Sequence, residues 1–285
     1  MAQARRRPVL PALVALLCSA CSGESSAPHL ARGNVLVNNG KREEAVAEYA
    51  AAARLSPKSE AARERLGDTL YDLGRKDEAL AAYRDAARVD PGAVTARIGS
   101  ARILAEKGDL AEARKELSAA LERAPTNLYA RLSRGNLAAR AKDPKAALED
   151  YATAVHLKSD NVAALTHYGL ALLEDGQIDA AELTVERLVK LAPDSPTGWY
   201  GRARIAAARG DGRAAGAALA ETEKRILPDA RANLREQGVP DAALEARAQE
   251  EARIARNRLR DEPAFARLAA DPAFRAAAGS GPQKQ

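Results

Sequence analysis

The chain has 285 residues, of which 4% are aromatic and 29% charged, and its formal net charge is +5. Three arginines at positions 5–7 supply most of that excess, and without them 41 basic residues face 39 acidic ones. A nearly neutral surface with interspersed charges argues against nucleic-acid binding. The scarcity of aromatic residues argues against a bulky globular core, and no period-two run of β-branched residues predicts a strand.

The first predicted element is a leader over residues 1–20. The arginines precede an apolar run at residues 9–17 that is too short to span a bilayer as a helix, an order typical of a secretory signal. The run ends in LLCSACSGESS, which resembles the processing site of bacterial lipoproteins, with Cys21 in the place of the cysteine that receives the lipid. Cys18 occupies the position where those signals carry a leucine. We expect lipidation of Cys21, with plain secretion or an uncleaved anchor as the alternatives.

Lipid on Cys21 would fix the protein to a membrane, because more than one acyl chain makes anchoring stable. A linker over residues 21–27 follows, and at about 3.5 Å per residue it would hold the first helix within roughly 20–25 Å of the bilayer. The alternative for Cys18 and Cys21 is a redox pair or half of a metal site. Both cysteines lie in the signal segment and no second pair of metal ligands follows, which favours the lipoprotein interpretation.

A period of 34 residues governs the chain after the leader. Alanine recurs at this interval, glycine keeps a second register and proline a third. A fixed period of roughly 20–50 residues is typical of a stacked repeat protein. The positions are Ala45, Ala79, Ala113, Ala147, Ala181 and Ala215; Gly40, Gly74, Gly108, Gly176 and Gly210; and Pro57, Pro91, Pro125 and Pro193.

Each period predicts a helix, a turn and a second helix. A small residue midway along the first helix lets two helices approach, the turn glycine supplies the positive φ of a helix C-cap, and the proline ends the second helix. In the second helix a large apolar residue lies between two small ones, all on one helical face. The midway residues are Gly33, Gly67, Ala101, Gly135, Gly169 and Ala203, and the large residues are Tyr49, Tyr83, Leu117, Tyr151, Val185 and Leu219.

This pattern resembles the tetratricopeptide repeat family, in which positions 8, 20, 24, 27 and 32 carry a small residue, alanine, an aromatic residue, alanine and proline. Trp199 also matches the family, at position 4 of the sixth unit. The resemblance implies an all-α, right-handed α-solenoid, with six repeats within residues 28–229 and a helical cap after them. Counted from position 1, the units are 26–59, 60–93, 94–127, 128–161, 162–195 and 196–229.

Some positions depart from the family pattern. Position 7 is usually large and apolar but holds Arg32, Arg134 and Arg202 here, and we expect their stems to lie on the core while their guanidinium groups reach outward. The fourth repeat has Lys142 in place of the turn glycine and Ser159 in place of the proline. We therefore expect weaker packing in the fourth repeat than in the second or fifth.

The sixth repeat also departs, because Pro228 stands one position late. Since proline cannot continue a helix interior, we expect the repeat to end here. A short helix over residues 229–237 should follow, and then a longer one over residues 241–260. Packing in this repeat is also expected to be weaker.

Two acidic residues, each followed by proline, then precede the only phenylalanines of the chain, Phe265 and Phe274, and such pairs are typical of helix starts. We expect residues 230–278 to cap the repeats, with Phe265, Leu268 and Phe274 covering the open end of the solenoid. A docking peptide for a partner is the alternative. Residues 279–285 are expected to form a disordered tail.

In the family the first helices line a concave surface, and positions 2, 5, 6, 9, 12 and 13 point into it. The resemblance therefore implies a groove for protein partners, either envelope assembly subunits or extended peptides. Asparagines can hydrogen-bond a peptide backbone and tyrosines offer rigid contact area, although an ordinary solvated surface is the alternative. Leu30 replaces the lysine of the carboxylate-binding subtype, so we do not expect chaperone-tail binding. The candidate groove residues are Asn34, Asp68, Tyr71, Arg102, Tyr129, Asn136, His167, Tyr200 and Arg204.

Nothing in the sequence predicts catalysis, a metal or a cofactor. The three histidines lack the helical spacing of a zinc motif, and no phosphate-binding glycine loop is present.

The fold and the leader together favour a lipid-anchored scaffold of the bacterial envelope, at the outer membrane facing the periplasm, by analogy with pilus pilotins and outer-membrane assembly factors. The alternatives are an adaptor that recruits a peptidase or cell-wall hydrolase, and an adaptor without lipid.

Overall fold

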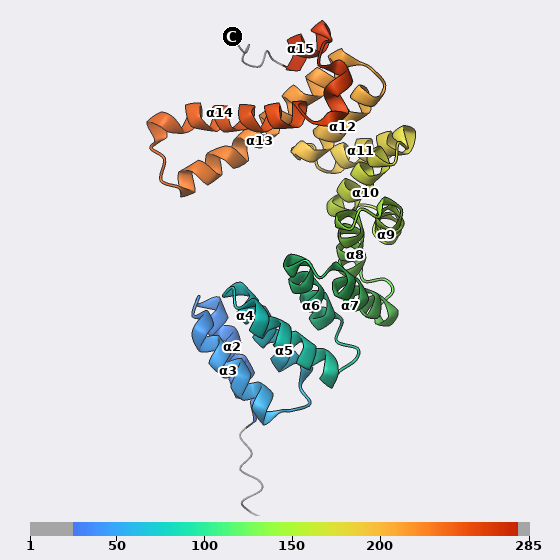
Figure 1. Cartoon of the computed structure of the whole chain (residues 1–285). Coiled ribbons are helices and arrows are strands. Elements are labelled where there is room, and N and C mark those ends of the chain that lie inside the picture. Colours follow the sequence, from blue (N-terminus) through green and yellow to red (C-terminus); the bar gives the residue numbers. More distant parts are fainter. Residues whose placement is uncertain (1–24, 279–285) are drawn as a thin grey trace, which may run out of the picture. The chain divides into compact units, whose positions relative to one another are not determined.

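The computed structural model describes residues 25–278. The predicted leader, Cys21 and the predicted disordered tail lie outside this range. Within it the secondary structure is helical and contains no strand, which confirms the predicted all-α class (Figure 1). No helix in the described range is long and apolar enough to cross a bilayer.

Successive helices form the six predicted pairs, and each pair covers one repeat. The pairs are α2 (Ser26–Asn38) with α3 (Arg42–Leu55), α4 (Glu60–Asp72) with α5 (Lys76–Val89), α6 (Val94–Lys107) with α7 (Leu110–Arg123), α8 (Leu128–Arg140) with α9 (Pro144–Leu157), α10 (Val162–Glu174) with α11 (Ile178–Leu191), and α12 (Pro196–Ala208) with α13 (Gly212–Glu236). Three further elements follow, namely α14 (Asp241–Arg260), the 3₁₀ helix η1 (Pro263–Leu268) and α15 (Pro272–Ala278).

The chain divides into two compact units after Pro125. The first unit contains α2 to α7, and the second contains α8 to α15. In both units a first helix packs against the second helix of its own repeat.

The turns inside the repeats have the predicted geometry. The turn glycines of five repeats have φ between +75° and +91°, the left-handed conformation that glycine adopts without steric cost. Lys142 takes the same conformation in the fourth repeat, with φ of 58°. The fourth turn thus keeps its shape although it lacks the glycine.

The small residue at position 8 makes room for the large side chain at position 24 of the same repeat. A Cβ atom placed on Gly67 would lie 2.7 Å from the Tyr83 ring, and one on Gly135 would lie 2.6 Å from the Tyr151 ring. Both rings are buried. The predicted close packing at position 8 is therefore confirmed. The backbone of the first helix packs directly against the aromatic ring of the second helix.

The arginines at position 7 end on carboxylates of the protein. Arg134 donates two hydrogen bonds to Asp150 at 2.8 and 2.7 Å, and Arg131 adds a third at 3.3 Å. The Asp150 side chain is only 6% exposed, so these bonds compensate a buried charge. Arg32 likewise pairs with Glu48 at the corresponding position of the first repeat.

The predicted break at Pro228 is wrong, because α13 continues through it to Glu236. Proline removes one backbone hydrogen bond inside a helix and disfavours its continuation. The extension is instead held by tertiary packing, which overrides this local preference. Figure 1 shows the far half of α13 beside α14, and the shared core of the two helices consists of Ala230, Leu234, Leu244 and Ala248.

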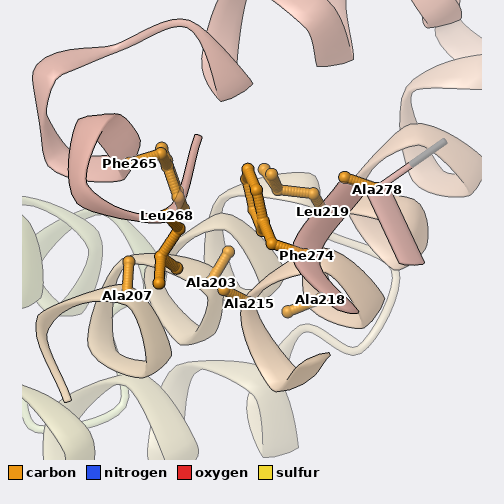
Figure 2. Packing of buried hydrophobic residues seen from close by; sticks show 9 residues of the cluster. All are labelled: Ala203, Ala207, Ala215, Ala218, Leu219, Phe265, Leu268, Phe274 and Ala278. Atoms are coloured by element: carbon orange, nitrogen blue, oxygen red, sulfur yellow. The ribbon is translucent and has the colours of Figure 1, made fainter. Parts of the chain in front are cut away.

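The last residues cover the end of the sixth repeat, as predicted. Figure 2 shows Phe265, Leu268 and Phe274 directed toward small residues of α12 and α13. The two phenylalanine rings stack 6.0 Å apart between centroids. Because both rings are buried in this core, they are not available as an exposed docking peptide.

Candidate functional site

Two of the tyrosines at position 24, Tyr83 and Tyr151, lie between two repeats and are contacted from both. One face of the Tyr151 ring lies over Gly135 of its own repeat, and the His167 ring of the next repeat stacks on it with centroids 5.2 Å apart. Tyr83 is enclosed in the same way, because Cβ atoms placed on Gly67 or Gly99 would lie 2.6–2.7 Å from its ring. Position 6 of one repeat therefore meets position 24 of the preceding repeat.

The tyrosine hydroxyl is bonded by position 9 of its own repeat. Tyr151 donates to Asn136 at 2.6 Å, and Tyr49 donates to Asn34 at 2.7 Å. Both asparagines thus use their carbonyl oxygen internally and keep the two N–H donors of the amide. Asp68 accepts from Tyr83 at 2.6 Å in the second repeat.

The sequence contains a signal for these bonds that the groove prediction missed. Asparagine or aspartate stands at position 9 only in repeats that carry tyrosine at position 24. The other three repeats have Arg102, Leu170 and Arg204 at position 9, opposite aliphatic residues at position 24. Reading the two positions together would have predicted the bond.

A hollow with a volume of about 740 Å³ lies between the fourth and fifth repeats. It brings together two predicted groove residues, Asn136 and His167, and the ring of Tyr151. Its lining is mainly apolar and is completed by Ala139, Arg140, Lys142, Pro144, Ala147, Leu170, Ala171 and Glu174.

Burial sets the protonation of the aromatic pair in this pocket. Burial lowers the pKa of His167, so the imidazole is neutral near pH 7 and offers one donor and one acceptor. Burial also raises the pKa of Tyr151 to about 12, with smaller contributions from the charges of Glu174 and Asp150. Tyr151 and His167 therefore present neutral hydrogen-bonding groups in a pocket whose lining is mainly apolar.

In the first unit Tyr71 and Arg102 lie together. The Arg102 guanidinium is 3.6 Å from the centroid of the Tyr71 ring, a cation–π contact. The Tyr71 hydroxyl donates to Glu106 at 2.5 Å, and this bond is the main reason why the pKa of Tyr71 is raised. Lys76 pairs with the same carboxylate at 2.8 Å.

At the end of the second unit, the chain itself covers Tyr200. The Tyr200 hydroxyl donates to Glu262, and its ring lies 6.3 Å from that of Phe265. The Arg204 guanidinium is 6.0 Å from the Tyr200 ring. Tyr129 differs from these residues, because it is 75% exposed on α8.

Among the described residues, no three or more histidine, cysteine, aspartate or glutamate side chains are grouped so that they could hold a metal ion. The site offers hydrogen bonds, aromatic faces and a hollow.

The chain is a helical repeat protein. Its helices come in pairs with a period of 34 residues, its turns carry glycine, and a small residue of one helix packs against a large residue of the next. Models of the tetratricopeptide repeat match residues 30–94, 65–127, 98–164 and 138–205. These segments run through more than half of the chain, which therefore belongs to the tetratricopeptide repeat family. No curated protein matches the sequence significantly.

Solved structures share the fold at low sequence identity. YrrB, described as a tetratricopeptide repeat protein with an unusual peptide-binding site, is 21% identical over 67% of this chain and 97% of its own, with a TM-score of 0.55. PilW, described as a widely conserved type IV pilus biogenesis factor, is 18% identical over 71% of this chain and 92% of its own, with a TM-score of 0.59. PilF of Pseudomonas aeruginosa is 16% identical over 70% and 90%, with a TM-score of 0.61. At these identities the likeness shows the fold alone.

Proposed function

We propose that the protein is a lipid-anchored, non-catalytic scaffold of the bacterial envelope that holds an extended segment of a protein partner in the groove of the fourth and fifth repeats. The observation that carries this proposal is the pocket of about 740 Å³ lined by Asn136, Tyr151 and His167. It joins a mainly apolar lining to the hydrogen-bonding groups of Asn136, Tyr151 and His167, which could contact both the side chains and the backbone of an extended peptide.

The proposed location at the membrane rests on the leader and on Cys21, which resemble a lipoprotein signal. Lipid on Cys21 would place the groove at a membrane, facing the periplasm. PilW is described as a pilus biogenesis factor, and that role of a protein with the same fold supports a partner from an envelope assembly machine. The scaffold would then stabilise such a subunit while its complex forms.

Site-specific photo-crosslinking tests the groove. A photoreactive amino acid replaces Tyr129 on α8, and in a second variant it replaces Leu183 on α11. The two side chains are almost equally exposed, at 75% and 78%, so accessibility is matched while the helix differs. We expect a discrete partner adduct from position 129 in native membranes and none from position 183.

Equal labelling from both positions would contradict binding in the groove. The identity of the adduct separates the alternatives, because a peptidase or cell-wall hydrolase would indicate a recruiting adaptor. An assembly subunit of a pilus or of the outer membrane would support the scaffold.

The anchor is tested by the intact mass of the mature protein and by a Cys21→Ser variant. We expect the parent to carry two or three acyl chains and to sediment with membranes, whereas the variant stays without lipid. A parent mass equal to that of the bare polypeptide would remove the anchor from the proposal and leave the groove in place.

A further inference from the structure

The turn of the fourth repeat contains a side chain where the other five repeats have none. Lys142 is the only non-glycine residue with positive φ in the described range, at 58°. Its amide donates to the carbonyl of Ala139 at 3.0 Å, and the next amide donates to Ala138 at 2.9 Å, so it occupies the C′ position of a Schellman motif. Left-handed backbone is unfavourable for a residue with a Cβ atom, and glycine serves at this turn everywhere else in the array.

The sequence around Lys142 compensates for this conformation. Asp143 accepts a hydrogen bond from the amide of Ala146 at 3.1 Å and so caps the start of α9. Pro144 follows at the first helical position, where its fixed φ suits a helix start. The turn therefore tolerates a residue that it does not favour, which points to a role for the side chain outside folding.

Lys142 lines the pocket of the fourth and fifth repeats. Asn136 and Leu170 line the same pocket. The pocket's charged lining consists of the cations Arg140 and Lys142 and the anion Glu174, which leaves a positive balance. A ligand with an apolar group and a nearby carboxylate would complement this arrangement.

We propose that Lys142 is a specificity-determining residue of the groove, which selects a partner segment with an aspartate or glutamate close to a bulky apolar side chain. This inference rests on the proposed function. The apolar side chain would enter the hollow above Leu170, the Asn136 amide would donate to the peptide backbone, and the Lys142 ammonium would pair with the carboxylate. Ion pairing of this kind contributes more to selectivity than to affinity.

A peptide-display selection tests the proposal. The probe is a library of random 12-residue peptides, selected on the full chain purified in detergent and, in parallel, on its Lys142→Gly variant. We expect peptides selected on the parent to carry an acidic residue at a fixed spacing from leucine, isoleucine or phenylalanine. Peptides selected on Lys142→Gly should keep the apolar residue and lose the acidic preference.

Synthetic forms of the selected peptide then give the dissociation constants. We expect Lys142→Gly to weaken the acidic peptide about fivefold, and the peptide's own Glu→Gln change to cost as much. The two changes together should cost no more than either alone, because they remove the same pair. Lys142→Gly should also raise Tm by about 2–4 °C, since it returns glycine to a left-handed position.

Gly108→Lys is the matched control, because it places lysine at the equivalent turn of the third repeat, whose residues do not line this pocket. It should lower Tm and leave the dissociation constant unchanged. Peptides without acidic preference that still lose affinity on His167→Ala would overturn the role of Lys142 and leave the groove standing. Peptides insensitive to both changes, or no enrichment at all, would count against the groove and the role of Lys142 together.

Discussion

Repeats one, two and four differ from repeats three, five and six in how they fill the space between paired helices. The first group combines glycine at position 8 with tyrosine at position 24 and asparagine or aspartate at position 9. In each of these repeats the ring lies on the glycine and the hydroxyl donates to position 9. The second group has leucine or valine at position 24 and no such bond.

The difference shows that position 9 has two uses in one array. In a tyrosine repeat the side chain at position 9 first satisfies a part-buried hydroxyl, and only its remaining donors or acceptors are left for another partner. In the other repeats position 9 has no hydroxyl to satisfy, and it holds Arg102, Leu170 or Arg204. The pocket with His167 lies where a tyrosine repeat meets a repeat of the other kind, and this junction gives it both polar and apolar walls.

The largest expected effect comes from filling the glycine of a tyrosine repeat. Gly67→Leu should destabilise the protein by about 3 kcal/mol or more, because even a Cβ atom would lie 2.7 Å from the Tyr83 ring, which is fully buried. Urea unfolding followed by circular dichroism measures the change. A midpoint equal to that of the parent would show that the ring does not depend on the glycine.

Gly169→Ala is the matched control in the second group. The nearest atom to an added Cβ is the Cγ2 of Val185 at 3.3 Å, which a small shift can accommodate. Alanine is also the better helix former, by about 1 kcal/mol. We expect this variant to unfold at the parent's midpoint or slightly above it, whereas Gly67→Ala should unfold well below.

The tyrosine hydroxyl supplies the next effect. Tyr83→Phe removes the donor from the charged Asp68, and we expect a loss of about 1.5–3 kcal/mol. Tyr151→Phe removes a donor from the neutral Asn136 and should cost about 1 kcal/mol. Equal losses, measured by urea unfolding, would show that the acceptor's charge is irrelevant and that the two repeats differ in packing alone.

The sequence predicted the repeat fold because its signal recurs six times at one spacing. Glycine at a turn and a small residue at position 8 each correspond to one local requirement, so the period alone identifies them. The continuation of α13 through Pro228 was missed because it depends on packing against α14, a contact between residues that no local pattern links.

The candidate site was predicted less completely. Position numbers from the family predicted which side chains face the groove, but they did not show which of these side chains bond to other residues of the protein itself. Asn136 bonds Tyr151, and Tyr200 is covered by Glu262 and Phe265. The partner of Tyr200 comes from a segment 62 residues later, and its position depends on how the cap folds back.

The smallest expected effect is the pH dependence of stability that His167 contributes where the fourth repeat meets the fifth. Burial lowers the pKa of His167 below its ordinary value of 6.5, so the unfolded chain binds a proton at a higher pH than the folded chain does. Stability should therefore fall as pH drops through about 6.5 and keep falling until the lowered folded pKa is reached. His167→Gln removes the titrating group, and its stability should change less over this range than that of the parent.

Unfolding followed by the fluorescence of Trp199, the only tryptophan and a residue of the same unit, measures this slope. The comparison needs the parent and His167→Gln at several pH values between about 5.5 and 7.5, where ordinary carboxylates stay ionised. Identical slopes would mean that the His167 ring is solvated in the folded protein, contrary to its stacking on Tyr151. A steeper dependence of stability on pH in the parent would show that His167 is shielded from water where the fourth repeat meets the fifth, because desolvation disfavours the protonated imidazole.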